Sequence, residues 1–155
     1  MRPNILIVFL CLTIGISGTT LAQNSAEQEV QKTIETLFDG MRESDSTKVA
    51  SAFHKEATMQ TILKNEEGKV YLNNGSLEGF LKAIGTEKNE VWDEKISGYE
   101  IKIDGELASA WTPYQFYRGE NFSHCGVNSF QLMKTGEDWK IFHIVDTRRK
   151  DNCVE

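Results

Sequence analysis

Apolar residues recur every three or four positions in the first part of the chain. Between Ala26 and Glu43 they fall on one helical face, at Val30, Ile34, Leu37, Phe38 and Met41. This spacing predicts an amphipathic helix. The polar residues 44–46 end it and cap a second helix that continues to about His54. A third helix is predicted over residues 77–85, again from apolar residues at helical spacing.

From residue 57 onwards the pattern changes to alternation of apolar and polar residues, which predicts β-strands. A short hairpin is expected first, followed after the third helix by four long strands over residues 91–103, 106–117, 122–134 and 139–149. Each of the three turns between these strands contains a glycine, where a hairpin needs positive φ. Helices followed by antiparallel strands predict an α+β domain whose sheet wraps the helices to bury its apolar face.

The N-terminal residues have a different character. Arg2 precedes an apolar run over residues 5–16, and Thr20-Leu21-Ala22 places small residues at the outer positions of a cleavage site. The run is shorter than the ~20 residues of a membrane-spanning helix. It therefore predicts a secretory signal peptide over residues 1–22, cleaved after Ala22. The remainder, residues 23–155, is predicted to be a single domain that is exported to the periplasm or secreted.

Charge limits the partners of the mature chain. The sequence has 17 Lys and Arg against 23 Asp and Glu, a net charge of −6. Removing residues 1–22 takes away one arginine and no acid, so the mature chain is more negative still. Such a chain is not expected to bind nucleic acid or, once the signal is removed, a membrane. It contains no Gly-rich phosphate loop, no His-Glu-x-x-His pattern and no nucleophile elbow, and no metal or cofactor is expected.

Two cysteines remain in the predicted mature chain, Cys125 and Cys153. Export to an oxidising compartment would permit a disulfide between them. Cys125 lies in the middle of a predicted strand, however, and Cys153 follows the last strand and must fold back to reach it. The sequence leaves the bridged and the free states equally open.

Two segments carry a resemblance to a known family. AFHKEA at residues 52–57 closes the predicted helical pair, and GEDWKI at residues 136–141 opens the last strand. With the order of elements, they resemble the nuclear transport factor 2-like superfamily. FSHCGVNSF at residues 122–130 is similar to its exported bacterial branch, labelled SnoaL-like or putative lumazine-binding. Members of the superfamily include isomerases, dehydratases, cyclases and binding domains, so the resemblance does not choose an activity.

The resemblance implies a cone-shaped fold. A strongly curved antiparallel sheet of about six strands, counting the short hairpin, would wrap on three helices from the N-terminal half. The concave side would hold a pocket, and the outer face of the sheet would often form a homodimer.

Alternation along the strands sorts residues by face. Setting Lys134 opposite Trp139 and Arg118 opposite Asn121 predicts a concave face whose closed end is packed by Leu107, Leu132, Trp139 and Ile141. Its pocket would be lined by Trp111, Gln115, Tyr117, His124, Asn128 and His143. The other face would carry Thr112, Tyr114, Phe116, Cys125 and Asp146, and is apolar enough to be a dimer surface. A one-residue bulge in either hairpin would exchange these two sets.

Two functions follow from the predicted pocket. The first is an exported binding domain for a small apolar or aromatic organic ligand, whose identity the sequence does not name. The second is an isomerase, dehydratase or cyclase in which His124 or His143 moves a proton and Asn128 or Tyr117 steadies an enolate-like oxygen. Each of these side chains also has a purely structural interpretation, as a hydrogen-bonded residue of the sheet. Asp146 is predicted to lie outside the pocket, in an ion pair with Arg148 or Lys140.

Overall fold

The computed structural model describes residues 18–154, with side chains from residue 23 onwards. The predicted signal peptide lies for the most part outside these residues, and its cleavage after Ala22 stays a prediction. Within the described part of the chain, no helix is both long and apolar enough to cross a membrane.

Three helices form as the spacing of apolar residues predicts. They are α1 (Gly18–Glu43), α2 (Ser46–Ala52) and α3 (Leu77–Gly85). All five apolar residues of the predicted face of α1 are at most 5% exposed, which confirms that face. The Asp45 carboxylate accepts hydrogen bonds from the backbone nitrogens of Thr47 and Lys48 and so caps α2. Ser76 caps α3 in the same way, through the nitrogen of Gly79.

The sheet has seven strands: β1 (Phe53–Lys64), β2 (Val70–Gly75), β3 (Trp92–Ile96), β4 (Glu100–Asp104), β5 (Leu107–Arg118), β6 (Asn121–Thr135) and β7 (Asp138–Thr147). Their order is β2-β1-β7-β6-β5-β3, and β4 pairs with β5 beside β3. The α+β class is confirmed, with one strand more than expected. The sheet is mostly antiparallel, but β1 and β7 run parallel.

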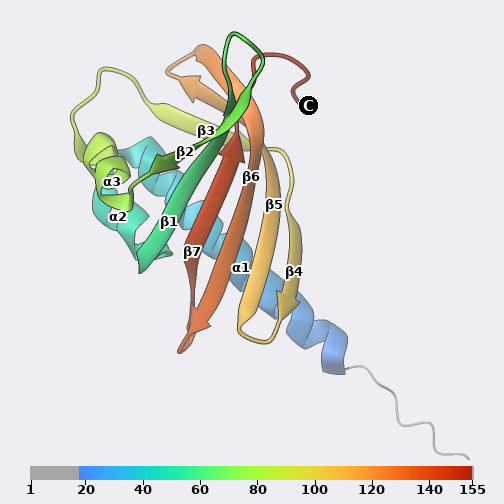
Figure 1. Ribbon diagram of the computed structural model, residues 1–155. Coiled ribbons are helices and arrows are strands. Elements are labelled where there is room, and N and C mark those ends of the chain that lie inside the picture. Colours follow the sequence, from blue (N-terminus) through green and yellow to red (C-terminus); the bar gives the residue numbers. More distant parts are fainter. Residues whose placement is uncertain (1–17, 155) are drawn as a thin grey trace, which may run out of the picture.

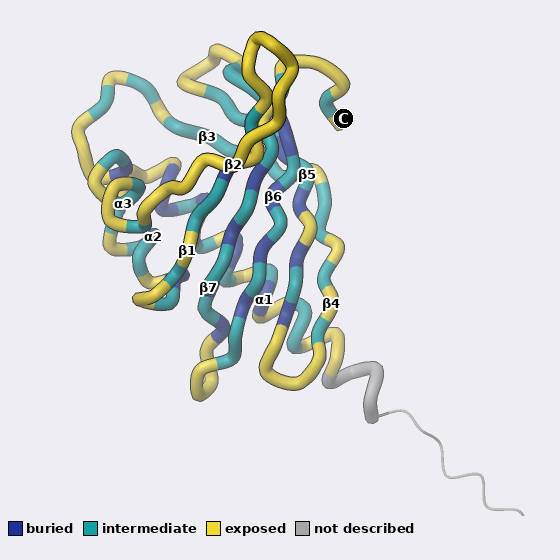
Figure 2. Tube along the Cα trace, in the orientation of Figure 1, coloured by how far each residue is buried: buried dark blue, intermediate teal, exposed yellow. Residues whose placement is uncertain are grey.

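Helix α1 crosses one face of the curved sheet, and α2 and α3 lie beside its β1 edge (Figure 1). Figure 2 shows buried stretches along β5, β6 and β7. The buried apolar residues of these strands pack with those of the three helices to form the core. It contains Phe130, Leu132, Trp139 and Ile141, each at most 3% exposed. Leu107 was predicted to help pack this closed end and is instead 48% exposed. Ala108 and Ala110 occupy the corresponding inward positions of β5.

The predicted strand over residues 91–103 is divided into β3 and β4. Both pair with β5, β3 from Tyr114 to Arg118 and β4 from Leu107 to Trp111. The division falls beside Pro113, which has no backbone N–H to offer a neighbouring strand. Its carbonyl still accepts a hydrogen bond from the Ser97 nitrogen at 3.0 Å. The proline thus explains why the edge of the sheet is interrupted there.

Two β-bulges set the faces of the long strands. Arg118 lies opposite Asn121 and Lys134 opposite Trp139, so both predicted turn registers are confirmed. Beyond each turn, one strand carries an extra residue: Ser123 in β6 and Phe142 in β7. A bulge shifts the register by one residue and therefore reverses which side chains face the core.

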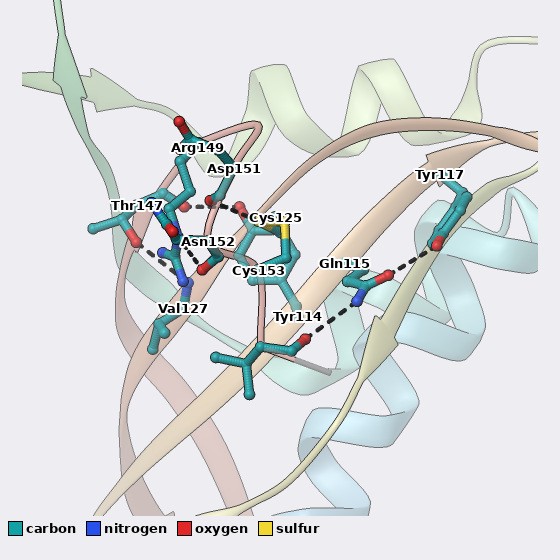
Figure 3. Close-up of a disulfide and its surroundings, with 11 residues drawn as sticks. Tyr114, Gln115, Tyr117, Cys125, Val127, Thr147, Arg149, Asp151, Asn152 and Cys153 are labelled. Carbon is teal, nitrogen blue, oxygen red and sulfur yellow. Dashed lines mark hydrogen bonds between the residues drawn. A yellow bond between two sulfur atoms is a disulfide. The ribbon is translucent and has the colours of Figure 1, made fainter.

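The C-terminal tail folds back onto β6. Backbone hydrogen bonds of 2.8 and 2.9 Å join Cys125 to Arg149, and Asn152 then turns the chain with φ of 49°. The turn brings Cys153 to Cys125, and the two form a disulfide with Cα atoms 5.7 Å apart (Figure 3). The tail packs on the convex side of the sheet, where the Gln115 amide donates to the Val154 carbonyl at 3.2 Å.

Candidate functional site

A cavity of about 670 Å³ lies on the concave side of the sheet, above the apolar core. Helices α1 and α3 and six of the strands contribute to its lining. Most of the wall is apolar or aromatic: Leu37, Phe38, Met41, Met59, Phe80, Trp92, Phe116 and Ile144. The volume lies within the range of sites that enclose a small organic molecule.

Buried polar residues form one row across the sheet. Thr61, Asp146, Asn128 and Thr112 are direct cross-strand neighbours on β1, β7, β6 and β5. All four are at most 9% exposed, and they are the buried polar residues found among the described residues. Residues in register across a sheet point to the same side, so all four face the concave side, and Thr61, Asp146 and Asn128 line the cavity.

Glu94 of β3 extends over this row and lines the cavity. The Asn128 side-chain nitrogen donates to its carboxylate at 2.6 Å. Burial raises the pKa of Glu94 to about 7, because it disfavours the charged form; the Asn128 hydrogen bond opposes this, and the Asp146 charge adds to it. A carboxyl group with this pKa can both donate and accept a proton near neutrality.

Asp146 is held by three neighbouring side chains. Thr61 donates to one carboxylate oxygen at 2.6 Å, and Arg148 Nε donates to the other at 2.8 Å. The Tyr114 hydroxyl lies 3.3 Å from the second oxygen and donates to the Thr147 carbonyl at 3.0 Å. Burial, with the charges of Glu94 and Asp146, raises the pKa of Tyr114 well above its ordinary value, so it stays a neutral donor.

His124 of β6 lies between two aromatic rings. The ring centroids of Tyr114 and Phe116 are 5.7 and 5.1 Å from that of the imidazole. Its Nδ1 lies 3.0 Å from the Ser123 hydroxyl. Burial lowers the pKa of His124, as does the Arg148 charge, while Asp146 opposes them. The imidazole is therefore neutral at pH 7 and available as an acceptor or donor.

The structure brings two of the six predicted pocket residues into the cavity, His124 and Asn128. The predicted side of the sheet is wrong for the other four. Trp111 is 49% exposed on the convex face. The hydroxyl of Tyr117 donates to Gln115 at 2.8 Å on that same face, beside the C-terminal tail (Figure 3). His143 pairs with the Thr58 hydroxyl at 2.7 Å.

The two bulges are the physical reason for these errors. The extra residue Ser123 turns Tyr114 and Phe116 of β5 towards the concave side in place of Gln115 and Tyr117. Phe142 does the same for Ile144 and Asp146 of β7. Asp146 was therefore expected outside the cavity and lies inside it, although its predicted ion pair with Arg148 is present.

Glu94 was not considered a site residue from the sequence. A signal for it exists, because alternation in the segment WDEKI puts Glu94 on the same side as Trp92 and Ile96. An acid between two inward-facing apolar residues indicates an inward-facing carboxylate. Both aromatic and carboxylate groups are thus available to a ligand.

Among residues 18–154, no group of three or more His, Cys, Asp or Glu side chains is arranged to hold a metal ion.

Comparison with solved structures places the fold among known ones. A protein of unknown function from Mycobacterium tuberculosis aligns with a TM-score of 0.69 and 14% identity, over 90% of this chain and 80% of its own. A protein described as "Putative Scytalone Dehydratase" from Novosphingobium aromaticivorans aligns with a TM-score of 0.68 and 11% identity, over 88% and 92%. An NTF2-like protein of unknown function from Shewanella baltica aligns with a TM-score of 0.60 and 17% identity, over 83% of this chain and 97% of its own. At these identities the likeness shows the fold alone.

Sequence comparison gives the family. No curated protein matches the chain. Residues 25–145, which include β1 to β6, most of β7 and most of the cavity lining, match the family described as "Putative lumazine-binding". The chain therefore belongs to this family and has the nuclear transport factor 2-like fold.

Proposed function

We propose that the concave cavity binds a small organic molecule with a flat, apolar or aromatic body. The observation that carries the proposal is the cavity itself: aromatic and apolar walls enclose about 670 Å³, and polar groups converge on one side of it. This combination is typical of small-molecule sites, where apolar walls supply affinity and a few polar groups supply orientation.

The family description supports a more specific ligand class. Lumazine is a flat bicyclic heterocycle whose edge carries carbonyl and ring-nitrogen groups. A ligand of this kind would place its rings against Trp92 and Phe116, which meet edge to face with centroids 6.1 Å apart. Its polar edge would meet Glu94 and Asn128. Protonated Glu94 can donate a hydrogen bond and ionised Glu94 can accept one. It can therefore bind a ligand edge that presents an acceptor or one that presents a donor.

Acid–base catalysis is the second candidate function, and Glu94 is the observation that favours it. The carboxyl group faces the cavity with a pKa of about 7, which suits a group that takes and returns a proton. His124 lines the same cavity and would assist it, whereas His143 lies outside. In this proposal the protein is an isomerase, dehydratase or cyclase, and dehydration is the activity in the description of the Novosphingobium aromaticivorans protein.

Ligand binding is tested with two matched aromatic variants. Phe116→Ala removes a cavity wall, and we expect it to weaken binding of lumazine or riboflavin about tenfold, close to the 1.4 kcal/mol of a partly lost aromatic contact. Trp111→Ala removes a larger aromatic group from the convex face and should leave affinity unchanged. Fluorescence titration measures both. Equal weakening by the two variants would contradict this site.

The same titrations separate binding from catalysis. Mass spectrometry of the ligand after incubation with the protein should recover it unchanged if the protein only binds. A product formed by the wild type and not by a Glu94→Gln variant would establish the catalytic alternative.

We further propose that the mature protein is exported and dimeric. Residues 1–22 support export, and so does the disulfide, since oxidising compartments preserve disulfides. The exposed Leu107 and Trp111 on the convex face support a dimer. Protein from its host should begin at Gln23 by mass spectrometry and sediment as a dimer that Trp111→Glu dissociates. Retention of residues 1–22 would contradict export, and a monomeric wild type would contradict the dimer.

A further inference from the structure

A second hollow adjoins the open end of the cavity. It is lined by nine residues, of which Arg118, Ser123, His124 and Arg148 also line the cavity. The other five are Glu90, Asn121, Phe122, Arg149 and Lys150. Because four residues line both, the two hollows lie side by side. We call the second one the mouth; it lies within reach of a molecule seated in the cavity.

The mouth is cationic although the whole chain has a net charge of −6. Four of its nine residues are Arg or Lys, and one, Glu90, is acidic. Glu90 pairs with Arg118 at 2.6 Å, and Arg148 pairs with Asp146. Among the described residues, no carboxylate forms an ion pair with Arg149 or Lys150. A local positive potential therefore remains at the mouth.

The charges are ordered along the cavity. Asp146 belongs to the buried polar row and Glu94 lies over it, whereas Arg118, Arg149 and Lys150 line the mouth. Arg148 lies between the two sets, and its Nε donates to Asp146 at 2.8 Å. A ligand anion would be repelled by the deep carboxylates and attracted by the mouth. Guanidinium groups suit such an anion, because their N–H donors match the two oxygens of a carboxylate or phosphate. The order of charges thus specifies which end of a ligand enters first.

We propose that the ligand is an anion whose flat body lies in the cavity and whose terminal phosphate or carboxylate is bound at the mouth by Arg118, Arg149 and Lys150. The proposal rests on the ligand-binding function proposed above and adds the chemical class of the ligand. The rings enter first, towards Glu94 and Asn128. The charged group remains next to solvent, where it costs the least desolvation.

Variants at the mouth should change affinity in opposite directions. Arg118→Gln and Lys150→Gln each remove a cation and should weaken binding of an anionic ligand about threefold. Glu90→Gln removes the carboxylate that pairs with Arg118 and should tighten binding of the anionic ligand by a similar factor. Lys102→Gln on the distant strand β4 makes the same change in net charge as the first two and is the matched control. It should have no effect.

The probes are matched pairs that differ in one charged group: FMN and riboflavin, naphthyl phosphate and naphthol, naphthoate and naphthamide. Calorimetric titration should show tighter binding of the anionic member of a pair, and raising NaCl from about 50 to about 500 mM should remove the difference. Preference for the phosphates alone, or for naphthoate as well, identifies the anion. Equal affinity within every pair, or equal effects of Lys102→Gln and Arg118→Gln, overturns the anion site but not the cavity. Failure of all six compounds to bind overturns the proposed function as well.

Discussion

Gly126→Ala is expected to lower the free energy of unfolding by about 3 kcal/mol, the upper end of the usual range for overpacking. A Cβ atom at this position would overlap the backbone oxygen of Thr147 and would lie 2.9 Å from Cε1 of the Tyr114 ring. The ring crosses β6 at this glycine, and its hydroxyl reaches the Thr147 carbonyl on β7. Neither obstacle is the free end of a flexible chain, so the backbone itself must move.

Gly98→Ala is the matched control for this substitution. A Cβ at position 98 meets no atom within 4 Å. The change should therefore alter stability by no more than about 0.5 kcal/mol. Urea unfolding followed by circular dichroism measures both variants. A Gly126→Ala protein as stable as Gly98→Ala would show that Tyr114 does not lie across β6 in the way described.

The part of the fold that could be predicted from the sequence depends on local patterns. The apolar face of α1 is set by residues three and four apart, and all five predicted positions are buried. The hairpin turns at residues 118–121 and 135–138 are set by their glycines, and both registers next to them are confirmed. Such features need no knowledge of the rest of the chain.

The pocket depends on information that alternation alone does not contain. One extra residue in a strand reverses every assignment beyond it, and here it happens twice, at Ser123 and Phe142. The sequence carries a sign of the bulge in β7. Ile141 and Phe142 are adjacent large apolar residues, and Phe142 is the extra residue. If regular alternation continued through such a pair, one of the two apolar side chains would be exposed to solvent. A bulge avoids this exposure, and β7 has one at this point.

The disulfide illustrates a different limit. The sequence shows Cys153 beyond the last strand, and nothing local indicates that the tail reverses. The reversal depends on pairing of Arg149 with Cys125 and on the left-handed conformation of Asn152, which asparagine adopts more readily than most residues. The bridge is therefore a consequence of tertiary pairing, and cysteine spacing could not decide it.

Glu94→Gln is expected to make the protein more stable than the wild type by about 3 kcal/mol above pH 7, and equally stable near pH 4.5. Burial raises the pKa of Glu94 from 4.5 to about 7 in the folded protein. Between these values the folded state binds more protons than the unfolded state, so wild-type stability falls as pH rises. The glutamine side chain stays neutral over this pH range and keeps an oxygen that accepts from the Asn128 amide. The stability of the variant therefore does not fall in this way as pH rises.

The measurement is the difference in unfolding free energy between the variant and the wild type from pH 4 to pH 8. Taking the difference cancels the other titrating groups, and Glu100→Gln, an exposed carboxylate on β4, controls for the loss of one negative charge. A difference that does not change with pH would mean that the pKa of Glu94 is the same in the folded and the unfolded protein. If a cavity ligand accepts a hydrogen bond from protonated Glu94, its affinity should be constant below the folded-state pKa of about 7 and should fall as pH rises through it, and in Glu94→Gln it should not fall. A fall in affinity that begins near pH 7, where the stability difference levels off, would show that the Glu94 carboxyl group donates to the ligand.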